Sequence, residues 1–97
     1  MEAHSNAPLR GGKFTNWEGG VRPAAFVHSP LLPRKSGGTW YNGSLSETDW
    51  MATFSALAGI QSPPGIDGID IWPNLVDISS PPRRGEVHVW LSNVTWP

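Results

Sequence analysis

The chain has 97 residues, a formal net charge of −1 at neutral pH and no cysteine. The lack of cysteine excludes disulfides, thiolate metal sites and a cysteine nucleophile within this sequence. The nearly balanced charge gives no general attraction to nucleic acid or to anionic lipid, so we expect no nucleic-acid partner. No apolar run is long enough to span a membrane, and the first residues lack the pattern of a signal peptide, so we expect neither feature in this sequence.

Residues 8–22 are rich in glycine, with two glycine pairs and one cation, Lys13, between them. Glycine lets the backbone take positive φ and approach other groups closely, which a site-forming loop needs. The lysine ammonium is a compact charge with three donors, suited to a sulfate or phosphate oxygen. The alternative is a surface turn with a solvated lysine. A phosphate-binding P-loop is excluded, because Ala7 and Phe14 stand where that motif requires glycine and a hydroxyl side chain.

Residues 24–28 form a short apolar run that Ser29 and Pro30 close, which is typical of a buried strand. The segment that follows, up to Gly43, is rich in glycine, proline and basic residues. We expect it to be an exposed loop in which Arg34 and Lys35 are solvated.

A helix is predicted at residues 48–58. Ser46 and Asp49 have the spacing of a capping box, in which the serine hydroxyl accepts a hydrogen bond from the backbone of Asp49. Gly59 supplies the left-handed position that ends many helices. The apolar residues of this segment fall on one stripe at helical spacing, which we expect to face a core: Trp50, Met51, Phe54, Leu57 and Ala58.

Asp67 and Asp70 have a spacing that raises the question of a calcium site. An EF-hand loop requires further oxygen ligands at fixed positions, and Trp72 and Pro73 interrupt that pattern, so we expect turns with solvated carboxylates. His4 is expected to be solvated, because a metal site needs several converging ligands.

The end of the sequence combines a proline-rich segment with an alternating one. Pro81 and Pro82 indicate a stiff linker. Residues 86–92 alternate apolar and polar side chains, which predicts a half-buried antiparallel strand.

Four ordered stretches of the sequence resemble the sulfatase family, and within it the arylsulfatase B-like enzymes. They are PLRGGKFTNWEGGVR with AAFVHSPLL (8–22 and 24–32), TDW to LAGI (48–60), DGIDIWP (67–73), and Pro82-Arg83 before Glu86-Val87. The resemblance implies an α/β class, as part of an alkaline-phosphatase-like sulfatase fold with short strands, many loops and one clear helix near 48–58. It implies that residues 1–80 are the C-terminal part of a catalytic domain. Residues 81–97 would then be a linker and the first strand of a smaller C-terminal domain.

The resemblance also implies hydrolysis of a sulfate ester, such as that of a sulfated sugar, with Lys13 at the position of the family's sulfate-binding lysine. The flanking Arg10 and Arg22 are expected to make structural contacts instead. The family uses Ca²⁺ and a formylglycine nucleophile made within a Cys-x-Pro-Ser-Arg motif. Residues 79–83 depart from that motif, since proline replaces its inner serine, and the opening residues lack the family's calcium-binding Asp-Asn pair. We therefore expect this chain alone to be catalytically incomplete, with the missing parts in upstream sulfatase sequence.

Asn42 and Asn93 each begin an Asn-x-Ser/Thr triplet, the acceptor pattern for N-glycosylation. Both agree with the lysosomal or secreted location that the resemblance implies. The alternative function is a small tryptophan-rich module that binds carbohydrate or another partner without catalysis. It requires three or more of these tryptophans to be exposed on one surface: Trp17, Trp40, Trp72, Trp90 and Trp96.

Overall fold

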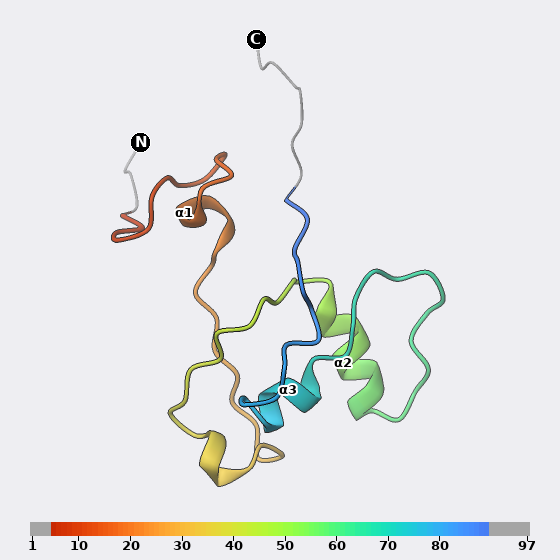
Figure 1. Ribbon diagram of the computed structural model, residues 1–97. Coiled ribbons are helices and arrows are strands. Elements are labelled where there is room, and N and C mark those ends of the chain that lie inside the picture. Colours follow the sequence, from red (N-terminus) through yellow and green to blue (C-terminus); the bar gives the residue numbers. More distant parts are fainter. Residues whose placement is uncertain (1–4, 90–97) are drawn as a thin grey trace. The chain divides into compact units, whose positions relative to one another are not determined.

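The computed structural model describes residues 5–89. In that range the chain forms short helices joined by long loops: α1 (Glu18–Val21), the 3₁₀ turn η1 (Arg34–Ser36), α2 (Asp49–Leu57) and α3 (Trp72–Val76) (Figure 1). Its internal contacts divide the described residues into two units, one of residues 28–87 and one of residues 5–27 with 88–89. None of the described helices has the length and apolar character needed to cross a membrane.

No β-strand forms within residues 5–89. The prediction of a buried strand at residues 24–28 is wrong for this structure, in which Phe26 is 92% exposed. A strand needs a neighbour that accepts and donates its backbone hydrogen bonds, and no described segment forms such a ladder with this run. The strand predicted at 86–92 is absent over residues 86–89, and its remainder lies outside the described residues. The α/β class therefore stays a prediction.

Helix α2 spans Asp49–Leu57, which confirms the helix predicted at 48–58 to within one residue at each end. At its start the Asp49 carboxylate accepts a hydrogen bond from the Ser46 N–H (2.8 Å), and the Ser46 carbonyl accepts one from the Asp49 N–H (3.0 Å). The serine hydroxyl does not cap the helix as expected, since it pairs with the Thr48 hydroxyl at 2.9 Å. Gly59, with φ of +69°, ends the helix as predicted.

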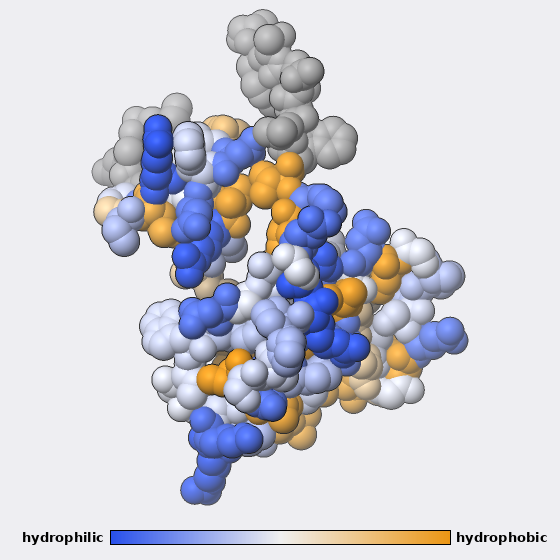
Figure 2. Space-filling model, viewed as in Figure 1, coloured by the Kyte–Doolittle hydropathy of each residue, from blue (hydrophilic) through white to orange (hydrophobic). Residues whose placement is uncertain are grey.

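The apolar stripe of α2 faces outward, contrary to the expectation that it packs in a core. Met51 and Phe54 are 58% and 60% exposed. Phe54 also stacks on Trp50, with ring centroids 5.6 Å apart. The buried face of the helix instead carries small and polar side chains: Asp49, Ala52, Thr53 and Ser55. Apolar side chains consequently reach the surface of the molecule, as Figure 2 shows in orange.

Helix α3 (Trp72–Val76) was not predicted from the sequence. Pro73 lies in its first turn, where backbone N–H groups have no acceptor within the helix. The N–H that proline lacks therefore costs no helical hydrogen bond. Ile71, just before the helix, and Leu75 within it are buried apolar residues. Thr53 links this segment to α2, because its hydroxyl accepts from the Ile71 N–H (3.1 Å) and donates to the Asp49 carbonyl (2.7 Å). The Thr53 hydroxyl thus joins α2 to the residue that precedes α3 by a hydrogen bond.

Candidate functional site

The glycine-rich loop of residues 8–22 is closed by its own backbone. The Gly19 N–H donates to the Arg10 carbonyl at 2.8 Å. The Thr15 hydroxyl accepts from the Gly12 N–H (3.1 Å) and donates to the Gly12 carbonyl (2.7 Å), so one side chain satisfies both backbone groups of one residue. The Asn6 amide donates to the Gly19 carbonyl at 2.9 Å and ties the preceding segment to the loop.

The second glycine pair allows α1 to lie directly against this loop. A Cβ built at Gly19 would overlap the carbonyl oxygens of Gly11 and Arg10, and one at Gly20 would overlap the carbonyl oxygen of Thr15. Any other residue would therefore force the short helix away from the loop. The close approach that the sequence predicted from its glycines is present here.

Lys13 lies on the exposed side of the loop. Its Nζ is 5.2 Å from the centroid of the Phe14 ring, which is within the range of a weak cation–π contact. Phe14 itself has φ of +72°, an uncommon conformation for a residue with a side chain. Within residues 5–89 the ammonium of Lys13 has no carboxylate partner. Lys13 is thus held at a turn with its charge open to an incoming anion.

The two arginines that flank Lys13 are already engaged. The guanidinium carbon of Arg10 lies 3.9 Å from the centroid of the Trp17 ring. Arg22 pairs with Glu18 one helical turn away, with NH1 and Oε2 3.2 Å apart. Both arginines make internal contacts, as expected, and the Phe14 contact of Lys13 is longer than the Trp17 contact of Arg10.

A second charged cluster, in the unit of residues 28–87, centres on Asp49 and Arg84. The Asp49 side chain is fully buried and that of Arg84 is 14% exposed. Arg84 Nε donates to Oδ2 of Asp49 at 2.8 Å, and the Ile69 N–H donates to Oδ1 at 3.0 Å. Arg84 also donates to the Asp67 carbonyl at 2.9 Å. The ion pair therefore holds the start of α2, the turn before α3 and the segment after α3 together.

Opposing effects act on the pKa of Asp49. Burial by itself raises that pKa, but the hydrogen bonds from Arg84, Ile69 and Ser46 and the charge of Arg84 outweigh burial and hold it below its ordinary value. The hydrogen bond with Asp49 in turn raises the pKa of Arg84. Both side chains are charged at neutral pH. Since every contact of the pair is internal, we assign it a structural role.

The Asp49–Arg84 pair and the contacts around Arg83 together form a clamp in the unit of residues 28–87. Arg83 NH1 lies 3.7 Å from Oδ2 of Asp70 in a more exposed pair. The Arg83 N–H donates to Oδ1 of the buried Asn74 (3.1 Å), whose amide group donates to the Pro81 carbonyl (2.9 Å). The family resemblance drew attention to Arg83, whereas Arg84 makes the buried pair. No local sequence signal marks a pair separated by 35 residues.

The described residues do not fit a metal site, since they contain no group of three histidine, aspartate or glutamate side chains placed to hold an ion. Asp70 takes part in a turn as expected, because its carboxylate accepts from the Trp72 N–H at 2.9 Å, but this carboxylate is half-buried beside Arg83 and is not solvated as expected. His4 lies outside the described residues.

Each unit exposes one of the candidate tryptophans that the structure describes. Trp17 and Trp40 are exposed but belong to different units, and Trp72 is half-buried. Trp90 and Trp96 lie outside the described residues, as does the glycosylation candidate Asn93.

Known proteins that are similar to the chain include two sulfatases. The chain is 45% identical over 86 residues to arylsulfatase J of Mus musculus, a match that covers 87% of this chain and 14% of that protein. It is 41% identical over 73 residues to steryl-sulfatase of Mus musculus, covering 73% of this chain and 11% of that protein. No family model matches the chain, and no solved structure matches it. The two relatives support placing the chain in the sulfatase family, as a segment that spans a small part of a sulfatase's length.

Proposed function

We propose that this chain is the C-terminal part of the catalytic domain of an arylsulfatase, of the arylsulfatase B-like type, and that Lys13 binds the sulfate group of the substrate. The proposed reaction is hydrolysis of a sulfate ester, such as that of a sulfated sugar. The proposal rests on the similarity to two proteins named as sulfatases. The observation that carries it is the position of Lys13 on a loop whose other two cations are engaged by Trp17 and Glu18.

The charge of Lys13 suits this reaction. When the bond between sulfur and the ester oxygen breaks, negative charge is spread over the sulfate oxygens and the leaving oxygen. A fixed ammonium beside those oxygens stabilises that charge, by a few kcal/mol where water is excluded. Lys13 is exposed in this structure. The proposal therefore requires that the bound substrate and the rest of the domain exclude water from the loop.

The rest of the catalytic apparatus is proposed to come from other sequence of the same domain. The chain contains no cysteine to form a formylglycine, and its described residues do not fit a calcium site. We therefore assign no step to either group here. In this proposal the complete enzyme is lysosomal or secreted and binds Ca²⁺, while the 97-residue chain alone does not turn over a chromogenic aryl sulfate.

The test is the kinetics of Lys13→Ala in a complete sulfatase that carries this segment. If Lys13 acts mainly on the charge of the transition state, kcat and kcat/KM should fall together, by about 10²–10³. Lys13→Arg should not restore the rate, because the planar guanidinium presents its donors in a different geometry.

Arg22→Ala is the matched control, because Arg22 is a cation of the same loop and already pairs with Glu18. It should leave kcat nearly unchanged. Wild-type kinetics in Lys13→Ala, or a larger loss in Arg22→Ala, would show that Lys13 does not bind the sulfate.

A further inference from the structure

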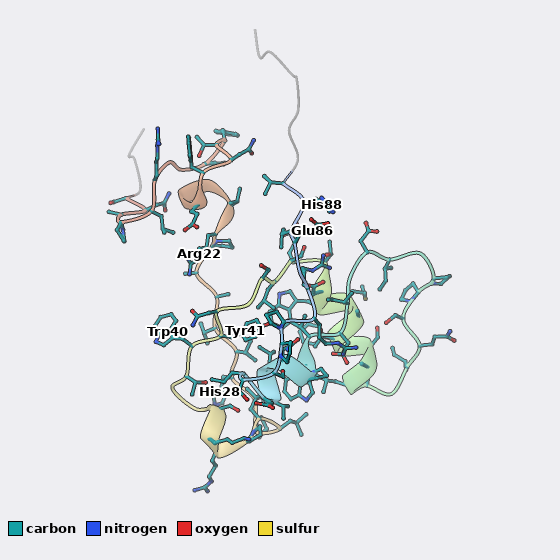
Figure 3. The ribbon with its side chains drawn as sticks, in the orientation of Figure 1. Arg22, His28, Trp40, Tyr41, Glu86 and His88 are labelled. Carbon is teal, nitrogen blue, oxygen red and sulfur yellow. The ribbon has the colours of Figure 1, made fainter. Side chains whose placement is uncertain are left out.

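The segment around Asn42 presents an aromatic ring and a side-chain amide to solvent. Trp40 is 85% exposed, and Asn42 is exposed as well. Figure 3 shows the rings of Trp40 and Tyr41 on opposite sides of the chain. Asn42 follows Trp40 by two residues, so their Cα atoms are at most about 7 Å apart.

Tyr41 anchors this segment. Its hydroxyl oxygen is buried without a hydrogen-bond partner among the described residues, and burial raises the pKa of the phenol. A Cβ at Gly43 would overlap that hydroxyl, so the glycine leaves the space that the ring occupies. Its two neighbours, Trp40 and Asn42, are both exposed.

We propose that Asn42 carries an N-linked glycan whose first sugar stacks on the exposed face of Trp40. Asn42-Gly43-Ser44 has the form of an acceptor triplet, and both Asn42 and Ser44 are exposed in a stretch without regular secondary structure. In the transfer, the amide nitrogen of Asn42 bonds to the anomeric carbon of the donor oligosaccharide and loses a proton. The pyrophosphate of the lipid-linked donor leaves with the bonding electrons.

Trp40 provides the reason why the sugar is ordered as well as attached. A pyranose ring has an apolar face of C–H groups, and an indole offers a large flat partner for it. Without such a partner most of the Trp40 ring is in contact with water. The spacing of two residues keeps the ring close enough to the acceptor amide for the first sugar to reach it. This inference is independent of sulfate hydrolysis and requires only passage through the secretory pathway.

The attachment is tested with the 97-residue chain directed into the secretory pathway of a cultured eukaryotic cell. The readout is the loss of mass on digestion with peptide N-glycosidase, measured on the whole membrane fraction so that retained protein is also scored. The Asn93→Gln chain should lose mass on this digestion. The chain that carries both Asn42→Gln and Asn93→Gln should not. Equal digestion of both proteins, or no digestion of Asn93→Gln, overturns the proposal.

The stacking is tested on the Asn93→Gln protein after its glycan is trimmed to a single N-acetylglucosamine. The N-acetyl methyl proton signal should be displaced upfield by the indole ring current, and this shift should be lost in Trp40→Ala. Trp17→Ala is the matched control, because Trp17 is also exposed but lies in the other unit, and it should leave the shift in place. A methyl signal at the position of the free sugar, or one that Trp40→Ala does not change, overturns the stacking.

Discussion

Arg84 Nε lies 2.8 Å from Oδ2 of Asp49 and joins the first residue of α2 to a residue 35 positions later in the chain. The same carboxylate accepts from the N–H groups of Ser46 and Ile69. A fully buried carboxylate that accepts five hydrogen bonds, three of them from one guanidinium, holds its surroundings in one arrangement. Four predictions follow from this clamp, the loop and the exposed face of α2.

Loss of Arg84 should destabilise the unit strongly. Arg84→Met keeps most of the side-chain volume but leaves the Asp49 carboxylate buried without its cation, which costs roughly 3–5 kcal/mol. The measurement is native-state hydrogen exchange of the Ile69 amide, which donates to Asp49. Arg83→Met is the control, because the Arg83 pair is longer and more exposed, and it should cost at most about 1 kcal/mol. Similar acceleration in both variants would contradict the role of the clamp.

Acid should weaken the same unit through Asp49. Its pKa is lower in the folded chain than in the unfolded chain, so its stabilising contribution is complete above the unfolded value of about 3.9 and is lost as pH falls through the folded value. Stability should therefore decrease below about pH 4. Asn in place of Asp49 should flatten this dependence, measured as Ile69 amide protection against pH. Asp77→Asn should flatten it less, because Asp77 is exposed and draws its lowered pKa from hydrogen bonds with Ser79. Equal slopes for Asp49→Asn and the unmodified chain would refute the assignment.

A methyl group at Gly19 should open the glycine-rich loop. The added Cβ of Gly19→Ala would overlap the carbonyl oxygens of Gly11 and Arg10, and such overpacking costs about 1–3 kcal/mol. The hydrogen bond from the residue 19 amide to Arg10 should weaken, so that amide should exchange faster with solvent. Gly85→Ala, where a Cβ meets no neighbouring atom within 4 Å, is the control. In a complete sulfatase, Gly19→Ala should also lower kcat/KM, since it displaces the loop that holds Lys13.

The outward face of α2 should tolerate polar substitution. Phe54→Gln removes an apolar ring that is 60% exposed, so it should leave the stability nearly unchanged and reduce self-association of the isolated chain. Light scattering measures the association, and amide exchange of Ile71 measures the stability. Ala52→Gln, on the buried face of the same helix, should destabilise the chain instead. A loss in Phe54→Gln as large as that in Ala52→Gln would mean that the apolar stripe is packed in solution.

Local features were predictable because their causes lie within a few residues. Helix α2 was located by its acidic start, its apolar spacing and Gly59, each of which acts within one or two helical turns. The loop around Lys13 was marked by glycines, and the structure uses Gly19 and Gly20 for a close approach of backbone to backbone. The motifs around these elements also indicated the sulfatase family, which the two relatives support.

Sequence by itself located the helix and the glycine loop with Lys13 as its central cation, and it indicated the sulfatase family, which the two relatives support. The tertiary structure decided which face of α2 is buried, that Arg84 rather than Arg83 pairs with Asp49, and that residues 24–28 remain unpaired. These outcomes depend on partners far away in the chain, and the energy of burial or of a strand ladder exists only when such a partner is in contact. The polar face of α2 is buried because Arg84, Ile69 and Ile71 satisfy its Asp49 and Thr53, a complement that no pattern within the helix contains.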